Sequence, residues 1–570
     1  MAAAREWLAG DPDPETRAEL AALIEKNAQA ELAERFAAPL EFGTAGLRGI
    51  VGAGLARMNR AVVIRATRGL GEFLASRRSG ARNLPVVLGY DARSDSVRFA
   101  ADAAGVLLAM GIPVRVFERE VPTPLVAYAA RALGALAGIV ITASHNPREY
   151  NGFKVYLDDA IQLTPPTDRL IASAIAGVGL ARDVPRVEID PRPESLVAAT
   201  ERVPGELFER YLADVAVALP PGGAPLRIAY SPLHGVGWSY LRRAFEYAGF
   251  SDVRAVPEQA EPDGSFPTTP FPNPEEPTSI QAALSFAAQE KADLLLINDP
   301  DADRLSAAVP TLSGQYRQLS GNQIGLLLAD ALLERARSGG VENGLVVASV
   351  VTTPLLGKMA RDRGAQFEET LTGFKWIWTA ARALERERSL RFVFACEEAL
   401  GYSVSAAVRD KDGVSAALCL ARIAAELREK EQTLLDRLGE LYRKHGLWVS
   451  AQHNLVRPGA DGQAQMRASV ERLAARPPAE LAGRKVTSLR DFRIPGARPR
   501  WLATADLVEL TLDGGGRVLV RPSGTEPKLK IYVDLELPLA ASEAWSAAEE
   551  RGQAQALTIA RAVEAALGAS

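Results

Sequence analysis

Residues 138–147 read GIVITASHNP, a short apolar run that leads directly into a polar turn. The same arrangement recurs at residues 293–304, DLLLINDPDADR, and at residues 391–401, RFVFACEEALG. Each apolar run has the length and composition of a buried strand. In open α/β sheets, ligands bind beyond the carboxyl ends of the strands. The three stretches therefore predict three similar α/β domains whose polar loops contribute to one cleft.

Outward from these stretches, apolar runs alternate with Ala-rich helical segments along most of the chain. This alternation predicts an α/β fold with mixed, mostly parallel sheets. Further strands are expected at residues 86–90, 114–117, 226–230 and 344–351, and a helix at residues 96–110.

Four parts of the chain differ from this alternating pattern. The first 40 residues show helical spacing of apolar residues, and residues 262–277 are Pro-rich, which indicates an extended surface loop. Residues 441–499 have a looser composition with Arg and Pro. After them, residues 507–512, 517–520 and 530–533 predict an antiparallel sheet that is followed by a final helix.

Length and composition limit the class of protein. The chain has 570 residues, a formal net charge of −4 and 47% hydrophobic residues, which indicates several folded domains and argues against a general binder of nucleic acids or membrane surfaces. The only cysteines, Cys396 and Cys419, exclude a disulfide framework. With no apolar run long enough for a signal peptide or a membrane span, the expected compartment is the cytoplasm.

Three aspartates, Asp299, Asp301 and Asp303, alternate directly after an apolar run. In an extended segment alternate side chains point the same way, so the three carboxylates would converge and repel one another unless a cation lay between them. All-oxygen acidic ligation suits Mg²⁺. A solvated acidic turn is the alternative, and an EF-hand is excluded because its glycine position holds Arg304. Arg304 would suit an anionic group of a substrate.

Ser144 follows a predicted strand on a sharp turn, which favours either a nucleophile or a turn-forming or helix-capping serine. A serine hydrolase is disfavoured because no GxSxG motif is present, and His145, adjacent in sequence, is expected to be badly placed as the serine's base. Lys154 is close enough in sequence to reach the same pocket as an acid or base, although a surface lysine is the alternative.

Two further motifs suit anions. Residues 41–49, EFGTAGLRG, could carry Arg48 toward an anion, but they match neither the dinucleotide fingerprint nor a phosphate-binding P-loop. Residues 521–527 read RPSGTEP. Arg521 could bind a phosphate through two parallel hydrogen bonds, and Ser523, Gly524 and Thr525 could form an anion-binding nest. A simple hairpin turn is the alternative for this second motif.

Taken together, these segments resemble the α-D-phosphohexomutase superfamily, and most closely its long, phosphopentomutase-like branch. The motifs that carry the resemblance are GTAGLRG, TASHNP, NGFKVY, SPLHGVG, DPDADR, TLTGFKW, CEEALGY, RDKDGVSAA and RPSGTEPKLKIY. The resemblance implies three α/β domains and a C-terminal α+β domain of helix-grip type around a central cleft. The expected domain bounds are 1–205, 206–321, 322–445 and 446–570.

The resemblance also implies roles for individual residues. Ser144 would be the phosphoserine, and a phosphate oxygen on Ser144 would hold Mg²⁺ together with Asp299, Asp301 and Asp303. Lys154 would be the acid or base, with Arg48 and His145 near the transferring phosphoryl group. The substrate would be bound by two sets of residues: Arg304, Gly373, Lys375 and Glu397 for the sugar, and Arg521, Ser523, Gly524 and Thr525 for the non-reacting phosphate.

The implied activity is a phosphosugar mutase that moves a phosphoryl group between C1 and C6 of glucose phosphate, with Mg²⁺ and a sugar 1,6-bisphosphate. Phosphopentomutase, phosphomannomutase and glucose-1,6-bisphosphate synthase are the alternatives, because Glu397-Glu398-Ala399 lacks the serine that many members have at the third position. The expected partner is a small sugar phosphate, and the expected state is a monomer or weak homo-oligomer.

Two other classes of protein are disfavoured. A phosphatase with an aspartyl nucleophile would have the motif DxDx[TV], and Asp303 stands where that motif has Thr or Val. A sensor built on an inactive mutase would lack the serine or an aspartate.

Overall fold

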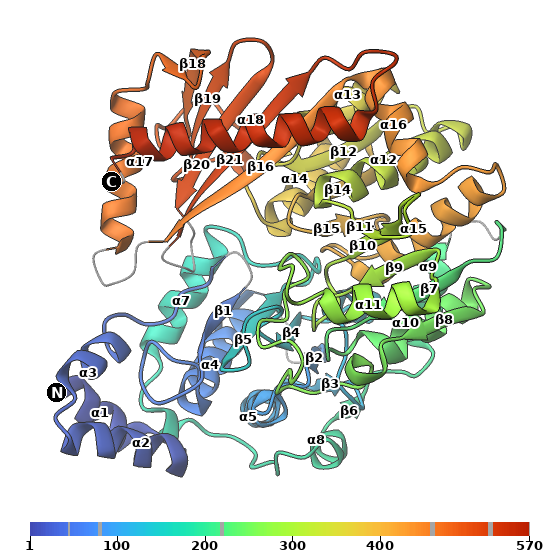
Figure 1. The fold of residues 1–570 in the computed structure, drawn as a ribbon. Helices are drawn as coiled ribbons and strands as arrows, with labels where there is room; N and C mark the ends of the chain where they lie inside the picture. The colour runs from blue at the N-terminus through green and yellow to red at the C-terminus, as the bar shows by residue number, and fades with distance from the viewer. Residues whose placement is uncertain (44–45, 78–82, 217–221, 457–461, 523–527, 569–570) are drawn as a thin grey trace. The chain divides into compact units, whose positions relative to one another are not determined.

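The computed structural model describes residues 1–43, 46–77, 83–216, 222–456, 462–522 and 528–568. It divides into two compact units, of which the first comprises Met1–Leu319 with Gly401–Ala425 and the second comprises Ser320–Leu400 with Glu426–Ser570. The first unit contains two complete sheets, and the second contains the C-terminal antiparallel sheet and three of the four strands of the remaining sheet (Figure 1). The predicted architecture, three α/β domains followed by a C-terminal α+β domain, is confirmed; the central cleft stays a prediction.

The first sheet of the first unit has the strand order β1-β5-β4-β2-β3-β6. Its strands are β1 Leu47–Ile50, β5 Tyr150–Tyr156, β4 Ala137–Ile141, β2 Val86–Tyr90, β3 Val114–Val116 and β6 Glu201–Arg202. Strands β4, β2, β3 and β6 run parallel, whereas β5 is antiparallel to its neighbours β1 and β4. This mixed sheet has the predicted strands at its centre.

Helices cover both faces of this sheet. They include α4 Arg60–Arg77, α5 Ser96–Ala109, α6 Thr123–Ala132 and α7 Thr167–Gly177. Residues from α4 and α5 pack against Leu88 and Ile139 on one face. On the other face α6 approaches so closely that a Cβ at Gly89 would lie 2.5 Å from Val126. The predicted helical N-terminus is confirmed as α1 Ala2–Gly10, α2 Pro14–Glu25 and α3 Gln29–Arg35.

The second sheet of the first unit has the order β11-β10-β9-β7-β8. Its strands are β11 Tyr316–Gln318, β10 Ser306–Pro310, β9 Leu294–Ile297, β7 Arg227–Ser231 and β8 Asp252–Ala255, and its helices are α10 Gly237–Tyr247 and α11 Gln281–Glu290. Strand β9 is parallel to β7, so both polar loops that follow these strands leave the same edge of the sheet. Residues 262–277 form no helix or strand, as the proline content predicts.

Segment Gly401–Ala425 comes from the middle of the chain but belongs to the first unit. It contains β15 Gly401–Ser403 and α15 Gly413–Arg428, which continues beyond the segment. Asp410 accepts hydrogen bonds of 2.6 Å from Tyr156 Oη and from Gln162 Nε2, and Arg131 donates to the carbonyl of Ala406. Two buried hydrogen bonds and one exposed one therefore join this segment to the first sheet's domain.

The second unit begins with parallel strands in the order β13-β12-β14. These are β13 Gln366–Thr370, β12 Gly344–Ser349 and β14 Arg391–Glu397, with helices α12 Gly321–Ser338, α13 Pro354–Asp362, α14 Phe374–Arg388 and α16 Leu434–His445. Its second sheet is antiparallel, in the order β16-β21-β20-β19-β18-β17. The strands are β16 Leu447–Val456, β21 Lys528–Leu537, β20 Gly516–Pro522, β19 Val508–Leu512, β18 Arg484–Asp491 and β17 Glu480–Leu481.

The predicted antiparallel sheet and final helix are confirmed. Figure 1 shows the final helix, α18 Trp545–Ala566, running across this sheet, and it contacts β16 and β21. Residues 441–499, whose composition is looser, hold regular elements for which the sequence analysis named no strand or helix. That region contains β16, α17 Gly462–Ala475 and β18. One face of β16 and one face of β18 stay partly exposed, so both strands contain many polar residues and lack the apolar run by which the other strands were predicted.

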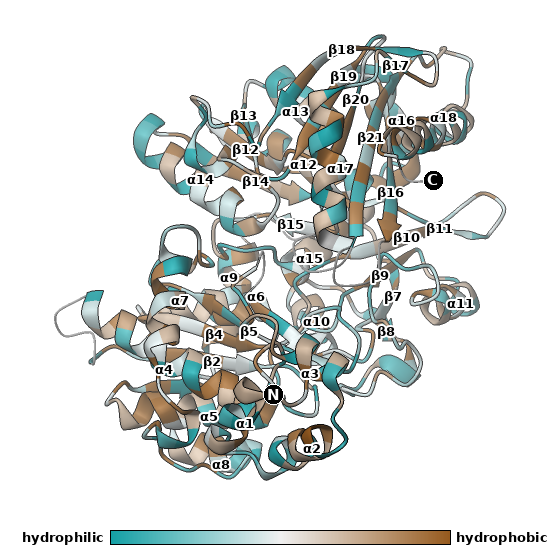
Figure 2. Cartoon of the chain, turned by 90° about the vertical axis from the view of Figure 1, so that its left-hand side faces the viewer, coloured by the Kyte–Doolittle hydropathy of each residue, from teal (hydrophilic) through white to brown (hydrophobic). Residues whose placement is uncertain are grey.

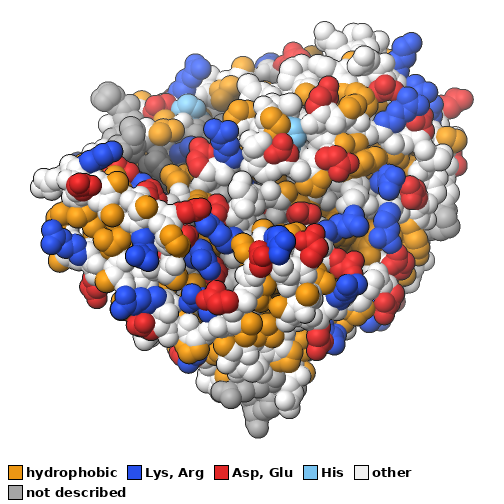
Figure 3. Space-filling view, turned by 90° about the horizontal axis from the view of Figure 1, so that it is seen from below, with side chains coloured by type: hydrophobic (Ala, Val, Ile, Leu, Met, Phe, Trp, Pro, Cys, Tyr) orange, Lys and Arg blue, Asp and Glu red, His pale blue; other side chains and the backbone are white. Residues whose placement is uncertain are grey.

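Hydropathy and charge agree with this architecture. In Figure 2 the hydrophobic colour lies mainly in the strands, while helices such as α14 carry hydrophilic stretches. Figure 3 shows basic and acidic side chains interspersed over the face that it presents, as expected for a nearly neutral chain. Every helix among the described residues is too short or too polar to cross a bilayer.

Candidate active site

The Ser144 loop leaves the carboxyl end of β4 in a left-handed turn. Ser144 has φ +55°, a value that is uncommon for a residue other than glycine. Its backbone nitrogen donates to Thr142 Oγ1 at 2.9 Å, and its carbonyl accepts from Arg93 Nη2 at 2.8 Å. The side chain is buried, with 1% of its surface exposed. Several hydrogen bonds therefore hold a strained, buried serine in one orientation.

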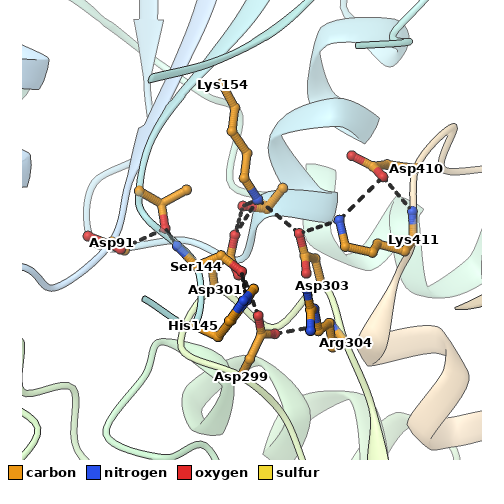
Figure 4. A network of polar contacts seen from close by, with 12 residues as sticks. Asp91, Ser144, His145, Lys154, Asp299, Asp301, Asp303, Arg304, Asp410 and Lys411 are labelled. Carbon is orange, nitrogen blue, oxygen red and sulfur yellow. Dashed lines mark hydrogen bonds and ion pairs between the residues drawn. The ribbon is translucent and has the colours of Figure 1, made fainter. Parts of the chain in front are cut away.

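The Ser144 hydroxyl has two partners in Figure 4. Oγ donates to Asp299 Oδ2 at 2.8 Å and lies 3.1 Å from His145 Nδ1. The expectation that His145 is badly placed beside its neighbour is wrong, because the left-handed turn brings the two adjacent side chains together. Burial and the positive charge of Arg304 hold the pKa of His145 well below its usual range, so the imidazole is neutral at pH 7.

The three aspartates converge, as predicted, but the predicted extended backbone is wrong. Ala302 has φ +53°, and its nitrogen donates to the carbonyl of Asp299 at 2.9 Å, so the loop is a turn. Carboxylate oxygens of Asp299, Asp301 and Asp303 lie within 4.8 Å of one another, and all three side chains are fully buried. Turn geometry rather than strand alternation brings the carboxylates together.

Two lysines partly balance this negative charge. Lys154 Nζ lies 2.6 Å from Asp301 Oδ2 and 2.9 Å from Asp303 Oδ2, and Lys411 Nζ lies 2.9 Å from the same oxygen of Asp303. Burial and the charges of Asp301 and Asp303 raise the pKa of Asp299 to about 8. Burial alone would raise the pKa of Asp301, but Lys154 holds it well below its usual range.

The carboxylate cluster fits a divalent cation. Oδ1 of Asp301 and Oδ1 of Asp303 are buried and accept no hydrogen bond from the described residues. Such orphaned buried oxygens are costly without a partner. Carboxylate oxygens are hard, negatively charged ligands, and here they converge from three aspartates. Such a site suits Mg²⁺ better than a softer metal. Asp299, Asp301 and Asp303 would hold the ion, and Ser144 lies against the same cluster.

The arginines expected at this site are close to it. Arg48 Nη1 donates to Asn146 Oδ1 in the Ser144 loop at 3.2 Å. Arg304 directs its backbone nitrogen to Asp299 Oδ1 at 3.1 Å, while its guanidinium lies 3.2 Å from Glu275 Oε2. The first unit thus gathers Ser144, His145, Lys154, Arg48, Arg304 and the three aspartates.

The remaining predicted residues belong to the second unit. Glu397, at the end of β14, accepts a hydrogen bond of 2.6 Å from the backbone nitrogen of Gly373. Lys375 lies in the first turn of α14 and Arg521 near the end of β20. The structure therefore brings Gly373 and Glu397 together. Ser523, Gly524 and Thr525 lie outside the described residues.

The prediction from the sequence missed two features of the first unit. Arg93 donates to the carbonyls of Ser144, Asn146, Pro147 and Tyr150, at 2.6–2.9 Å, and its Nε donates to Asp91 Oδ2 at 3.1 Å. Asp91 and Arg93 both follow β2 directly. The rule that ligand sites lie beyond the carboxyl ends of strands could therefore have identified them.

Lys411 is the second missed residue, and its signal was weaker. It follows no strand and comes from the distant segment that joins the first unit. Gly413 allows this segment to approach the aspartate loop, because a Cβ there would lie 2.3 Å from the carbonyl oxygen of Arg304. Lys411 and Gly413 lie in RDKDGVSAA, a motif that carries the family resemblance, so that motif was the sequence signal that could have drawn attention to them.

Comparisons with known proteins cover all four domains of the chain. Four family models match in order: the phosphoglucomutase/phosphomannomutase α/β/α domains I, II and III at residues 39–181, 207–314 and 320–445, and the C-terminal domain at residues 466–549. A probable phosphomannomutase of Haemophilus influenzae is 35% identical, covering 84% of this chain and 93% of the relative. A phosphopentomutase of Mus musculus is 33% identical, covering 94% and 90% respectively.

A solved structure supports the fold. The crystal structure of a putative phosphomannomutase from Thermus thermophilus has a TM-score of 0.67 at 23% identity, covering 92% of this chain and 98% of that one. At this identity the likeness concerns the fold alone. The four matched domains and the sequence relatives show that the chain belongs to the phosphoglucomutase/phosphomannomutase family of phosphosugar-mutase enzymes.

Proposed function

We propose that the protein moves a phosphoryl group between C1 and C6 of glucose phosphate through a phosphorylated Ser144 and a sugar bisphosphate. The observation that supports this most directly is the hydrogen bond of 2.8 Å from Ser144 Oγ to Asp299 Oδ2, within a cluster of buried carboxylates. A nucleophilic serine in contact with a candidate Mg²⁺ site is the arrangement that phosphoryl transfer needs.

The chain's own residues would position the group and move the proton. Arg93 and Thr142 hold the Ser144 loop, so the attacking and leaving oxygens can be kept in line. The neutral imidazole of His145 can exchange a proton with Ser144 Oγ, which lies 3.1 Å away. Lys154 is the proposed acid or base for the sugar hydroxyl. When bound, Mg²⁺ supplies charge neutralisation at the phosphoryl oxygens.

One turnover balances as two transfers. The free hydroxyl of the sugar phosphate takes the phosphoryl group from phospho-Ser144 and loses its proton, and the serine oxygen regains a proton. The sugar bisphosphate then presents its other phosphate, which returns to Ser144 as the serine hydroxyl loses its proton and the sugar oxygen that is left gains one, so that the phosphoenzyme is regenerated. We propose that Arg521, Ser523, Gly524 and Thr525 bind the non-reacting phosphate and that Arg304, Gly373, Lys375 and Glu397 bind the sugar.

The main alternative substrate is a pentose phosphate. The sequence Glu397-Glu398-Ala399 lacks the hydroxyl that many members offer to a hexose, and a relative that covers almost the whole chain is a phosphopentomutase. Phosphomannomutase and glucose-1,6-bisphosphate synthase activities use the same chemistry on the same scaffold.

Intact-mass spectrometry tests the phosphoserine. Incubation with glucose 1,6-bisphosphate and Mg²⁺ should add one phosphoryl group to the protein, and Ser144→Ala should abolish both the added mass and turnover. Ser265→Ala, which removes an exposed serine from the first unit, is the matched control and should keep both. Full turnover by Ser144→Ala would refute the mechanism. Comparing kcat/KM for the 1-phosphates of glucose, mannose and ribose then identifies the substrate.

A further inference from the structure

A cavity lies in the first unit, away from the candidate active site, between the N-terminal helices and helices α4 and α7. Its volume is about 720 Å³, inside the range of roughly 300–1,000 Å³ that is typical of small-molecule sites. Helix α1 and the segment after α3 form one wall, and the first family model begins only at residue 39. Most of this wall therefore comes from a part of the chain that the family models do not cover.

The lining of this cavity is mainly apolar and aromatic. Trp7 and Phe36 pack edge to face, with ring centroids 6.2 Å apart, and Phe42 and Leu47 contribute from the next segment. All but Leu47 are only half-buried, although such large apolar side chains are usually covered in a folded domain. The cavity thus offers unfilled apolar surface to a ligand.

One cation, Arg65 of α4, also lines the cavity. Its Nη2 donates to the carbonyl of Val178 at 3.2 Å, and its Nε is buried without a hydrogen-bond partner. Among the described residues no carboxylate pairs with Arg65. The only other charged residues of the lining, Glu6 and Glu41, are exposed. Burial lowers the pKa of Arg65, with no nearby acid to oppose that effect.

We propose that this cavity binds an apolar carboxylate, such as a medium-chain aliphatic acid, with the carboxylate on Arg65 and the chain against Trp7 and Phe36. The planar guanidinium fork matches a carboxylate, and the buried Nε would gain the partner that it lacks. An uncharged apolar ligand would leave the cation uncompensated, and a small hydrophilic anion would leave the aromatic wall uncovered.

Isothermal titration of the full-length protein with decanoate, decanol and acetate tests both parts of the ligand. Decanoate should bind at least about 10-fold more tightly than decanol, because a hydrogen bond to a charged group contributes about 1.5–3 kcal/mol. Acetate should bind more weakly still. Absence of decanoate binding, equal binding of decanol, or equal binding of acetate would overturn the proposal.

Three variants connect the binding to this cavity. Arg65→Met should weaken decanoate binding by at least about 10-fold, whereas Arg68→Met, which removes the half-buried partner of Glu72 one turn along α4, should not. Ala176→Phe, at an exposed position of the lining on α7, should also weaken binding while it leaves Arg65 in place. Unfolding curves confirm that each variant is folded. Unchanged decanoate affinity in a folded Arg65→Met or Ala176→Phe protein would place the binding elsewhere and reject the proposal.

Discussion

Ser144 Oγ donates a hydrogen bond of 2.8 Å to Asp299 Oδ2, although the two residues are 155 positions apart in the chain. Ser144 lies in the loop after β4 of the first sheet, and Asp299 lies in the loop after β9 of the second. The bond thus joins the proposed nucleophile to the candidate metal site across two domains of one unit. Contact between the proposed nucleophile and the candidate metal site is consequently built into the fold of the first unit.

Arg93→Lys should lower kcat more than it changes KM. Arg93 uses three guanidinium nitrogens for four loop carbonyls and Asp91, and a lysine has a single nitrogen to replace them. A small displacement of Ser144 would cost about 100-fold in rate. Steady-state kinetics at saturating Mg²⁺ measures this effect. Arg115→Lys, which changes an exposed ion pair with Glu201, is the control; lowered stability with unchanged kcat would mean that Arg93 has only a structural role.

Lys411→Met should lower kcat/KM by about 100-fold, the usual scale for losing one charge that stabilises a transition state. Lys411 neutralises Asp303 from a segment that lies far along the chain, while Lys154 remains in place as a second partner. Lys358→Met removes a half-exposed lysine near Glu536 and should leave the rate unchanged. If both variants behave alike, Lys411 takes no part in the reaction.

Without Mg²⁺, the free energy of unfolding should fall as the pH rises from about 4 to about 8. The pKa of Asp299 is about 8 in the folded protein and about 3.9 when unfolded, so the folded state holds this proton more tightly. The resulting stability is complete below the unfolded pKa and is lost as the pH approaches 8, by at most about 1.4 kcal/mol per pH unit.

Urea denaturation in a chelating buffer at several pH values measures this slope. Asp299→Asn carries no titratable group and should flatten the slope, and so should excess Mg²⁺, which favours the ionised carboxylates. A slope that is the same in wild type and in Asp299→Asn would assign the effect to other groups.

Ala399→Ser should shift substrate preference toward a hexose phosphate. The added hydroxyl can hydrogen-bond the sugar, and a neutral hydrogen bond contributes about 0.5–1.5 kcal/mol, or roughly a 2- to 10-fold change in relative kcat/KM. Ala399→Val adds bulk without the hydroxyl and separates the two effects. An equal change for glucose 1-phosphate and ribose 1-phosphate would show that this loop does not discriminate between them.

The sequence predicted the strands and the site residues correctly where a short apolar run is followed directly by polar residues. Strands such as Val86–Tyr90 and Leu294–Ile297 are short apolar runs, and the polar residues after them mark the site. The prediction failed for β16, whose mixed polarity reflects a half-exposed strand, and for the turn at Ala302, where a positive φ replaces extended backbone. Contacts such as Lys411 with Asp303 depend on tertiary packing, which no local pattern encodes.

The chain crosses between its two units three times, after Leu319, Leu400 and Ala425. During synthesis on the ribosome, the first unit can be completed only after residues 320–400 of the second unit have already emerged. Until then the nascent aspartate loop lacks Lys411 and the covering backbone at Gly413. A truncation after the second family domain would preserve Ser144 and all three aspartates yet leave their charge poorly compensated. The smallest fragment that retains the complete aspartate site must therefore extend to the segment that ends at Ala425.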